Sequence, residues 1–363
     1  FGQIPAPRPT PNSHNPSLLL AWRRFTSDLI VDFQRAQLDI LRQECPDHFV
    51  THNMMGFYDK CDYIRLGADL DFVSHDQYPL GFRRDWLDHD PVELAMPLDL
   101  MRGIKDTPFW IMEQQSGPSG WETVGPTPRP GQLRLWTAQS LAHGADAVVY
   151  FRWRTCLFGT EEYWHGILPH SGRPGRRYEE IARTISDLEP VMDQCAGSGS
   201  GADVALLYSW DQRWALQIQP HHPELDYRTH IAGYHRELFD RNVPVDFVSI
   251  EQDLGRYRLV VAPLLFLMTS EIAGALRGYV ESGGHLILTM RSGVKNWDNV
   301  VNADEPPGLL SELAGIRIDD YDCLQLGAQP VRWVASEVSG EGSKWADIIK
   351  PESATTLAAY QAD

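Results

Sequence analysis

One carboxylate in this sequence lies where a charge is costly unless it has a partner or a function. Residues 108–112 are apolar and aromatic and predict a buried strand, and Glu113 follows them directly. A turn rich in glycine and proline comes next, and Trp121 stands eight residues beyond the acid. A buried acid with a shifted pKa is a common catalytic group. An aromatic ring beside it could hold a sugar ring against the carboxyl.

A second loop carries polar and aromatic side chains of a similar kind. Glu162 and His165 are separated by Tyr163 and Trp164. A Glu-x-x-His pair can bind a metal, but no second set of histidines or cysteines in the sequence has ligand spacing. Carboxylate and imidazole groups beside aromatic rings are better suited to sugar hydroxyls, which need donors, acceptors and an apolar face. We therefore expect this loop to bind sugar, without a metal or another cofactor.

The elements that would position these side chains alternate between helix and strand. A long amphipathic helix is predicted from Ser17 to about Gln43, and four strands follow it, each with a helix or a long loop behind it. This alternation implies right-handed crossovers and a parallel sheet. The predicted strands are residues 48–54, 70–78, 108–112 and 147–153, and the predicted helices between and after them are residues 58–66, 92–103, 131–143 and 177–193.

Polar residues stand at the carboxyl ends of these predicted strands, where a β/α barrel places its active site. A closed barrel needs eight strands and about 250 residues, whereas only four strands are predicted here. The sequence therefore predicts that residues 1–195 are the second half of a (β/α)8 TIM barrel, with strands one to four outside the chain. The polar residues at the strand ends are Asn53, Asp76, Tyr78, Glu113 and Arg152.

A second domain is predicted after a linker of small residues at 196–202. Beyond the linker the alternation of strand and helix restarts, which predicts an open, flavodoxin-like α/β sheet within residues 203–363. The predicted strands are residues 204–208, 245–248, 259–262 and 285–289, with short strands near 316 and at 331–333, and the predicted helices are residues 229–241, 270–282 and 309–314.

Composition and charge exclude several classes of protein. The 363 residues carry a formal net charge of −17, which would repel nucleic acid and anionic membranes. No apolar run approaches the roughly 20 residues that span a bilayer. The five cysteines have no CxxC spacing, which favours free buried thiols over disulfides or a zinc site. Localisation stays open, with a cytoplasmic protein favoured over a secreted one, and the start at Phe1 suggests processing or a longer parent protein.

A series of motifs stands in order along this chain: Asn53–Gly56, Asp76–Pro79, Phe109–Gln115, Gly117–Trp121, Tyr150–Arg154 and Glu162–His170. Together these motifs resemble the β-galactosidases of glycoside hydrolase family 42. The resemblance covers nearly all of the chain. It implies a barrel followed by an α/β trimerisation domain that is similar to class I glutamine amidotransferases, which fits residues 203–363.

The resemblance implies a role for each candidate residue. Glu113 would be the nucleophile of a retaining glycosidase, which attacks the anomeric carbon and forms a covalent glycosyl-enzyme. Trp121 and Phe151 would line the galactose subsite, and Glu162 and His165 would bind hydroxyls of the galactosyl ring. The other carboxyl of a retaining enzyme lies about 5 Å from the nucleophile. In the family it follows strand four, so we expect it outside this chain.

Three further residues have expected roles at the site. Tyr78 is expected either to hydrogen-bond the Glu113 carboxylate or to pack against Pro79. Asp76 is a candidate contact of the substrate. Arg152 is expected to pair with an acid at the mouth of the barrel rather than to touch substrate.

The second domain has no cysteine at a sharp strand-to-helix turn, which an amidotransferase triad would need, so we expect it to be structural. The expected partners are a β-galactoside substrate and further copies of the chain, which would form a homotrimer through residues 203–363. Two alternatives stay open: the chain is a non-catalytic carbohydrate-binding or assembly fragment, or the sugar is a related one such as an arabinoside or a fucoside.

Overall fold

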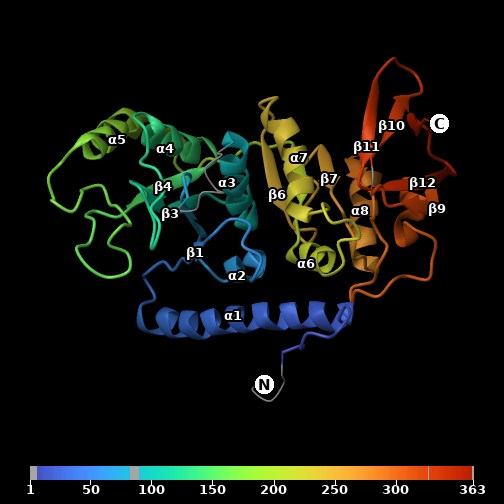
Figure 1. The fold of residues 1–363 in the computed structure, drawn as a ribbon, viewed down its shortest axis with the longest axis horizontal. Helices are drawn as coiled ribbons and strands as arrows, with labels where there is room; N and C mark the ends of the chain where they lie inside the picture. Colours follow the sequence, from blue (N-terminus) through green and yellow to red (C-terminus); the bar gives the residue numbers. More distant parts are fainter. Residues whose placement is uncertain (1–5, 82–89, 326, 362–363) are drawn as a thin grey trace.

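The computed structural model describes residues 6–81, 90–325 and 327–361. It contains two α/β units, joined between residues 195 and 204 (Figure 1). The first unit is built on one four-stranded parallel sheet, and the second unit is built on another. Helix α1 (Pro16–Glu44) runs along the same side of both units. Asn15 caps this helix, because its side chain accepts a hydrogen bond from the Leu18 N–H, and Pro16 occupies the first helical position.

The first sheet has the strand order β1-β2-β3-β4, and all neighbouring strands are parallel. Because β1 and β4 each have one neighbour within the described residues, the sheet is open at both edges. Consecutive parallel strands with a helix behind each one agree with the predicted part of a barrel. The elements are β1 (Asn53–Met54), α2 (Tyr63–Ala68), β2 (Ser74–Gln77), α3 (Pro91–Lys105), β3 (Phe109–Gln115), α4 (Gln132–Ala142), β4 (Ala145–Phe151) and α5 (Arg176–Cys195).

The strand boundaries correct two predictions that concern the site. Glu113 lies inside β3 and not in the turn after it, because Gln114 and Gln115 continue the pairing with β4 after a shift in register. The first strand is shorter than residues 48–54, because only Asn53 and Met54 pair with β2. Asn53 therefore begins β1 instead of following it.

The second sheet has the strand order β6-β5-β7-β8 and is also parallel. Numbered within this unit, the order is 2-1-3-4, which is how the flavodoxin-like order begins and confirms the predicted topology. The elements are β5 (Val204–Leu207), α6 (Trp210–Ile218), α7 (Tyr227–Phe239), β6 (Val245–Val248), β7 (Leu259–Ala262), α8 (Ser270–Glu281) and β8 (His285–Leu288).

Helix α6 was not predicted from the sequence. Ser209 caps it by accepting a hydrogen bond from the Gln212 N–H. Trp210 and Trp214 of this helix are almost fully buried, and their indole N–H groups donate to the Tyr58 and Asp59 carbonyl oxygens of the first unit, at 2.8 and 2.6 Å. The helix is therefore stabilised by contacts with a part of the chain about 150 residues away in sequence.

The residues after β8 form short elements at the end of the molecule far from the first unit (Figure 1). Strand β9 pairs with β12, and β10 lies between β11 and β13, with antiparallel pairing throughout. The elements are η2 (Gly308–Leu310), α9 (Ser311–Ala314), β9 (Ile316–Asp322), β10 (Ala328–Trp333), β11 (Ser339–Ser343), β12 (Ala346–Pro351) and β13 (Ala358–Tyr360).

One apolar cluster extends through both units. It includes Leu20 of α1, Leu98 of α3 and Ile111 of β3 from the first unit, together with Leu206 of β5 and Phe247 of β6 from the second. Because these side chains belong to one core, the two units pack as one folded body.

Three further observations concern the cysteines, metal-binding groups and possible membrane spans of the chain. The five cysteines are free, as predicted, but Cys61 is the only buried one, so the expectation of buried thiols is wrong for the other four. Among the residues that the structure describes, no group of three or more histidine, cysteine, aspartate and glutamate side chains could hold a metal ion. Over the same residues, no helix has both the length and the apolar character needed to cross a bilayer.

Leu20 and Leu29 of α1 form a matched pair for testing this packing, because Leu20 is fully buried and Leu29 is 45% exposed. We expect Leu20→Ala to lower the free energy of unfolding by about 2–5 kcal/mol, since the substitution removes buried apolar area and leaves a cavity. Leu29→Ala should change it by less than about 0.5 kcal/mol. Urea denaturation followed by circular dichroism measures both. Equal losses would contradict the packing of α1 described here.

Candidate active site

Two strands, β1 and β2, direct polar side chains toward the carboxylate of Glu113 on the neighbouring strand β3. Asp76 in β2 and Glu113 in β3 are register partners on adjacent parallel strands. Asn53 of β1 donates its Nδ2–H to Glu113 Oε1 at 3.4 Å, and the hydroxyl of Tyr78, just beyond β2, donates to Glu113 Oε2 at 2.7 Å. Each carboxylate oxygen therefore has a donor, and the two donors come from different parts of the sheet.

The hydrogen bond from Tyr78 decides between the two arrangements expected for this residue. Burial raises the pKa of the Tyr78 phenol well above its usual range, and the hydrogen bond to Glu113 acts in the same direction. The cause is that an ionised phenol would lie buried beside a carboxylate. Tyr78 therefore stays protonated and acts as a donor that fixes the direction of the Glu113 carboxylate.

Asp76 is the second carboxyl of this site. Burial, together with the neighbouring charge of Glu113, raises the pKa of Asp76 to about 7, and a hydrogen bond from Asn53 opposes the shift. Asp76 Oδ1 is buried and has no hydrogen-bond partner among the described residues. Two ionised carboxylates on adjacent strands repel each other, so Asp76 holds the proton of the pair up to nearly neutral pH.

Aromatic rings enclose the site around Trp164, which is buried. The ring of Trp164 lies with its centroid 4.8 Å from those of both Tyr78 and Trp121, and 6.2 Å from that of Phe151. The structure thus brings together three candidate residues from different segments of the chain. Trp164 itself was noted in the sequence only as an aromatic neighbour of the Glu162 loop. Its place at the centre of the cluster depends on the fold of that loop.

The loop that carries His165 is fastened to the turn after β3. The backbone N–H of His165 donates to the Pro118 carbonyl oxygen at 3.0 Å, and His165 Nδ1 lies 3.0 Å from the same oxygen. Ser116 Oγ donates to the carbonyl oxygens of Phe151 and His165, at 2.6 and 3.2 Å. Burial lowers the pKa of His165, so the imidazole is neutral near pH 7. With its Nδ1–H directed to carbonyl oxygens, its Nε2 is an acceptor for a hydroxyl group.

Glu162 belongs to the same loop, and its side chain is partly exposed. Its carbonyl oxygen lies 2.7 Å from His170 Nε2, and the ring of His170 packs edge-on against that of His165, with centroids 5.2 Å apart. His170 therefore supports both polar candidates of this loop. Sequence reasoning did not single it out, although it closes the motif in which they occur. No contact between the side chains of Glu162 and Glu113 is found within the described residues.

Arg152 pairs with an acid, as predicted. Its Nη2 lies 3.6 Å from the Glu161 carboxylate and donates to the Glu161 carbonyl oxygen at 2.8 Å. Its guanidinium carbon also lies 4.9 Å from the ring centroid of Phe151. Arg152 therefore links the loop that carries Glu161 to the ring of Phe151.

Comparison with known families agrees with this geometry. The family model described as beta-galactosidase matches residues 1–191, and that described as the beta-galactosidase trimerisation domain matches residues 202–363. The chain belongs to glycoside hydrolase family 42. With this membership, the first sheet is part of a TIM barrel, as the sequence predicted, and the second unit has the fold of the family's trimerisation domain.

Curated members of family 42 match the chain over its whole length. The beta-galactosidase Bga of Halorubrum lacusprofundi is 36% identical over 100% of this chain and 54% of its own length. The beta-galactosidase BgaH of Haloferax lucentense is 38% identical over 99% of this chain and 55% of its own length. The chain therefore spans about half the length of the curated relatives that it matches.

Solved structures of beta-galactosidases also match nearly the whole of this chain with about half of their own length. The polyextremophilic beta-galactosidase from the Antarctic haloarchaeon Halorubrum lacusprofundi aligns with a TM-score of 0.90 at 38% identity, covering 98% of this chain and 54% of that one. The beta-galactosidase from Bacillus circulans sp. alkalophilus aligns with a TM-score of 0.93 at 32% identity, covering 99% and 55%. The fold described here is therefore that of the corresponding half of these family 42 enzymes.

The raised pKa of Asp76 predicts how the stability of this family 42 chain depends on pH. Burial and Glu113 raise the folded-state pKa to about 7, whereas the pKa of an unfolded aspartate is about 4. Between these values the folded state holds a proton that the unfolded state releases, so stability falls as pH rises from about 4 to about 7. Asp76→Asn cannot ionise, so we expect it to gain stability relative to the native chain between pH 5 and pH 8.

Urea denaturation at the two pH values measures this gain. Asp298→Asn, at an exposed position, is the control and should follow the native chain at both. A difference between Asp76→Asn and the native chain that does not change with pH would contradict the assignment.

Proposed function

We propose that the whole protein is a retaining β-galactosidase and that Glu113 is its nucleophile. The observation that carries the proposal is the Glu113 carboxylate, which has one hydrogen-bond donor on each oxygen and lies beside a cluster of aromatic rings. In a double displacement such a carboxylate attacks the anomeric carbon as the leaving group departs with a proton from an acid. Water then hydrolyses the covalent galactosyl-enzyme. The beta-galactosidase names of the relatives support galactose as the sugar.

The neighbouring residues have the roles expected of a sugar subsite in this proposal. Trp121 and Phe151 line the galactose subsite, because both rings pack in the Trp164 cluster next to Tyr78. Glu162 and His165 bind hydroxyls of the galactosyl ring, and the acceptor that Nε2 provides while Nδ1 is directed to a carbonyl oxygen supports this role for His165.

Asp76 is proposed to contact the sugar as well. Its position beside Glu113 on the adjacent strand supports this role. The proton that Asp76 holds near neutral pH makes its carboxyl a donor for a sugar hydroxyl.

The acid/base carboxyl of the reaction is proposed to lie outside residues 1–363. A retaining enzyme places it about 5–5.5 Å from the nucleophile, on the other side of the glycosidic bond. Asp76 does not fit this place, because it is a register partner of Glu113 on the adjacent strand and lies beside the nucleophile. Since the chain spans about half of its relatives, we propose that the acid/base belongs to the rest of the protein.

We further propose that residues 1–195 are the catalytic half barrel, residues 196–202 the linker and residues 203–363 the part that assembles the whole protein as a homotrimer. The trimerisation description of the family model over residues 202–363 supports this role. Light scattering coupled to size-exclusion chromatography should give three copies for the whole protein. A stable monomer would overturn the assembly proposal and leave the catalytic one intact.

Replacing Glu113 tests the catalytic proposal in the whole protein. We expect Glu113→Gln to lower kcat by about 10⁴-fold or more, since loss of a covalent nucleophile removes the step that it carries. A 2-deoxy-2-fluorogalactoside should label Glu113 in the native protein, as peptide mass spectrometry would show. In Glu113→Ala, azide should restore turnover and yield the α-galactosyl azide, because the small anion attacks from the face that the carboxylate has left.

The outcomes separate this proposal from its alternatives. Labelling at a residue other than Glu113 would overturn the assignment. A panel of nitrophenyl galactoside, arabinoside and fucoside identifies the sugar. The sheet that is open at both edges favours a second expectation, namely that residues 1–363 alone do not hydrolyse o-nitrophenyl galactoside. Hydrolysis by this chain alone would place the acid/base within it.

A further inference from the structure

Helix α3 connects the two strands that carry Asp76 and Glu113, and it lies between the two units (Figure 1). It ends at its C-cap residue Asp106, and β3 begins three residues later at Phe109. Nearly every side of the helix is covered, because its buried residues include both apolar and charged side chains: Val92, Ala95, Met96, Leu98, Asp99, Leu100, Met101, Arg102, Gly103 and Ile104. The position of α3 therefore depends on the second unit as well as on its own sheet.

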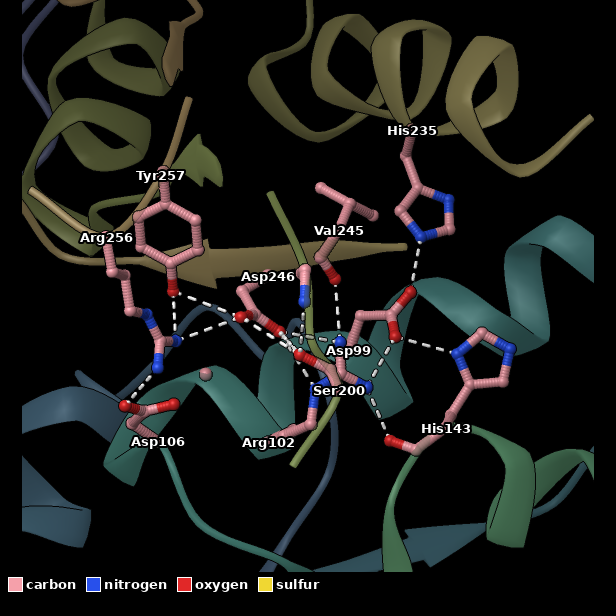
Figure 2. A network of polar contacts seen from close by, with 12 residues as sticks. Asp99, Arg102, Asp106, His143, Ser200, His235, Val245, Asp246, Arg256 and Tyr257 are labelled. Atoms are coloured by element: carbon pink, nitrogen blue, oxygen red, sulfur yellow. Dashed lines mark hydrogen bonds and ion pairs between the residues drawn. The ribbon is translucent and has the colours of Figure 1, made fainter. Parts of the chain in front are cut away.

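A buried network of charges joins α3 to the second unit (Figure 2). Asp99 Oδ2 lies 2.7 Å from His235 Nε2 of α7. Arg102 donates its Nε–H to Asp246 Oδ1 at 2.9 Å and an Nη2–H to the Val245 carbonyl oxygen at 2.7 Å, both in β6. Asp99, Arg102, His235 and Asp246 are all less than a tenth exposed. Buried charges are stable only when each one is paired and hydrogen-bonded, so these contacts restrict the geometry between α3 and the second unit.

Each carboxylate of the network is surrounded by donors. Asp99 also accepts from His143 and Arg102 within the first unit, at 2.7 and 2.8 Å. Burial alone would raise the pKa of Asp99, but the hydrogen bonds from His143 and His235 outweigh it and hold the pKa below its usual range. Asp99 therefore stays ionised throughout the neutral range.

Asp246 is held in the same way from the second unit. It accepts from Arg256 Nη2 at 2.9 Å, from the Tyr257 hydroxyl at 3.0 Å and from Ser200 Oγ at 3.1 Å. Arg256 also pairs with Asp106 at the end of α3 (Figure 2). The second unit thus contacts α3 up to the residue that leads into β3.

The backbones of the two units touch at Gly103. A Cβ atom on this residue would lie 1.8 Å from the carbonyl oxygen of Phe247 in β6, which no side chain could occupy. The Gly103 carbonyl oxygen accepts from Gln252 Nε2 at 2.9 Å. Helix α3 therefore rests directly on the backbone of β6, and a displacement of either element moves the other.

We infer that the second unit, besides any role in assembly, positions strand β3 of the first unit, which carries Glu113. Arg102 and Gly103 are the positioning residues in α3. They fix the C-terminal end of α3 against β6, and the short connection after Asp106 transmits that position to β3 and so to Glu113. This inference rests on the proposed function for the catalytic role of Glu113. The contact between α3 and β6 does not depend on that proposal. A misplacement of about 1 Å in a catalytic group can lower a rate by about 10²-fold.

Gly103→Ala and Gly233→Ala in the whole protein form a matched pair for the test. Both replace a helical glycine, but Gly233 of α7 is exposed and a Cβ there would meet no atom within 4 Å. Hydrogen exchange measured by mass spectrometry should show exchange in residues 106–115 that is about tenfold faster for Gly103→Ala and unchanged for Gly233→Ala. With β-galactoside, Gly103→Ala should lower kcat by about 10- to 100-fold. KM should change by less than about threefold, since the subsite residues on the other loops stay in place.

Arg102→Lys is the milder variant if Gly103→Ala does not fold. It keeps the charge but loses the forked donor that reaches both Asp246 and the Val245 carbonyl, so the same changes are expected at smaller size. Unchanged exchange in residues 106–115 in the folded variant would overturn the inference. Faster exchange with native kcat would also overturn it, because Glu113 would then not depend on the contact. If the native protein hydrolyses no galactoside, the proposed function fails, and exchange in residues 106–115 alone decides the inference.

Discussion

The close contact between α3 and β6 is the constraint on which the rest of this structure depends. A glycine at residue 103 lets two backbones meet, and a network of paired charges around Asp99, Arg102 and Asp246 surrounds that contact. Direct backbone packing tolerates little movement, and buried charges keep their partners because an unpaired one is costly. The two units therefore share one core, and α3 is held rigidly between the open first sheet and the second unit.

The candidate site follows from the register of three parallel strands. Parallel pairing sets Asp76 beside Glu113, and the repulsion between two carboxylates is relieved by a proton on Asp76. Asn53 and Tyr78 then each donate a hydrogen bond to one oxygen of the Glu113 carboxylate. A carboxylate that is fixed in direction and flanked by aromatic rings suits the role of a glycosidase nucleophile.

The sequence predicted the elements well where a pattern is local. Alternation of helix and strand gave the two parallel sheets, and a run of small residues marked the connection between them. The sequence did not predict the features that contacts between distant parts of the chain decide. Glu113 lies within β3 because Gln114 and Gln115 find partners on β4, and α6 forms where Trp210 and Trp214 are buried against the first unit. Trp164 could be recognised only as one aromatic residue among several, since its neighbours come from three other segments.

The sequence by itself determined the family, the two parallel α/β sheets and the acid that is the candidate nucleophile, because these follow from residue types and their spacing along the chain. The tertiary structure alone decided that Tyr78 donates to Glu113, that Asp76 carries a proton near neutral pH, and that α3 rests on β6. The physical reason is that hydrogen bonds, pKa shifts and backbone contacts depend on distances between residues far apart in sequence. Those distances are set by strand register and burial, which no local pattern contains.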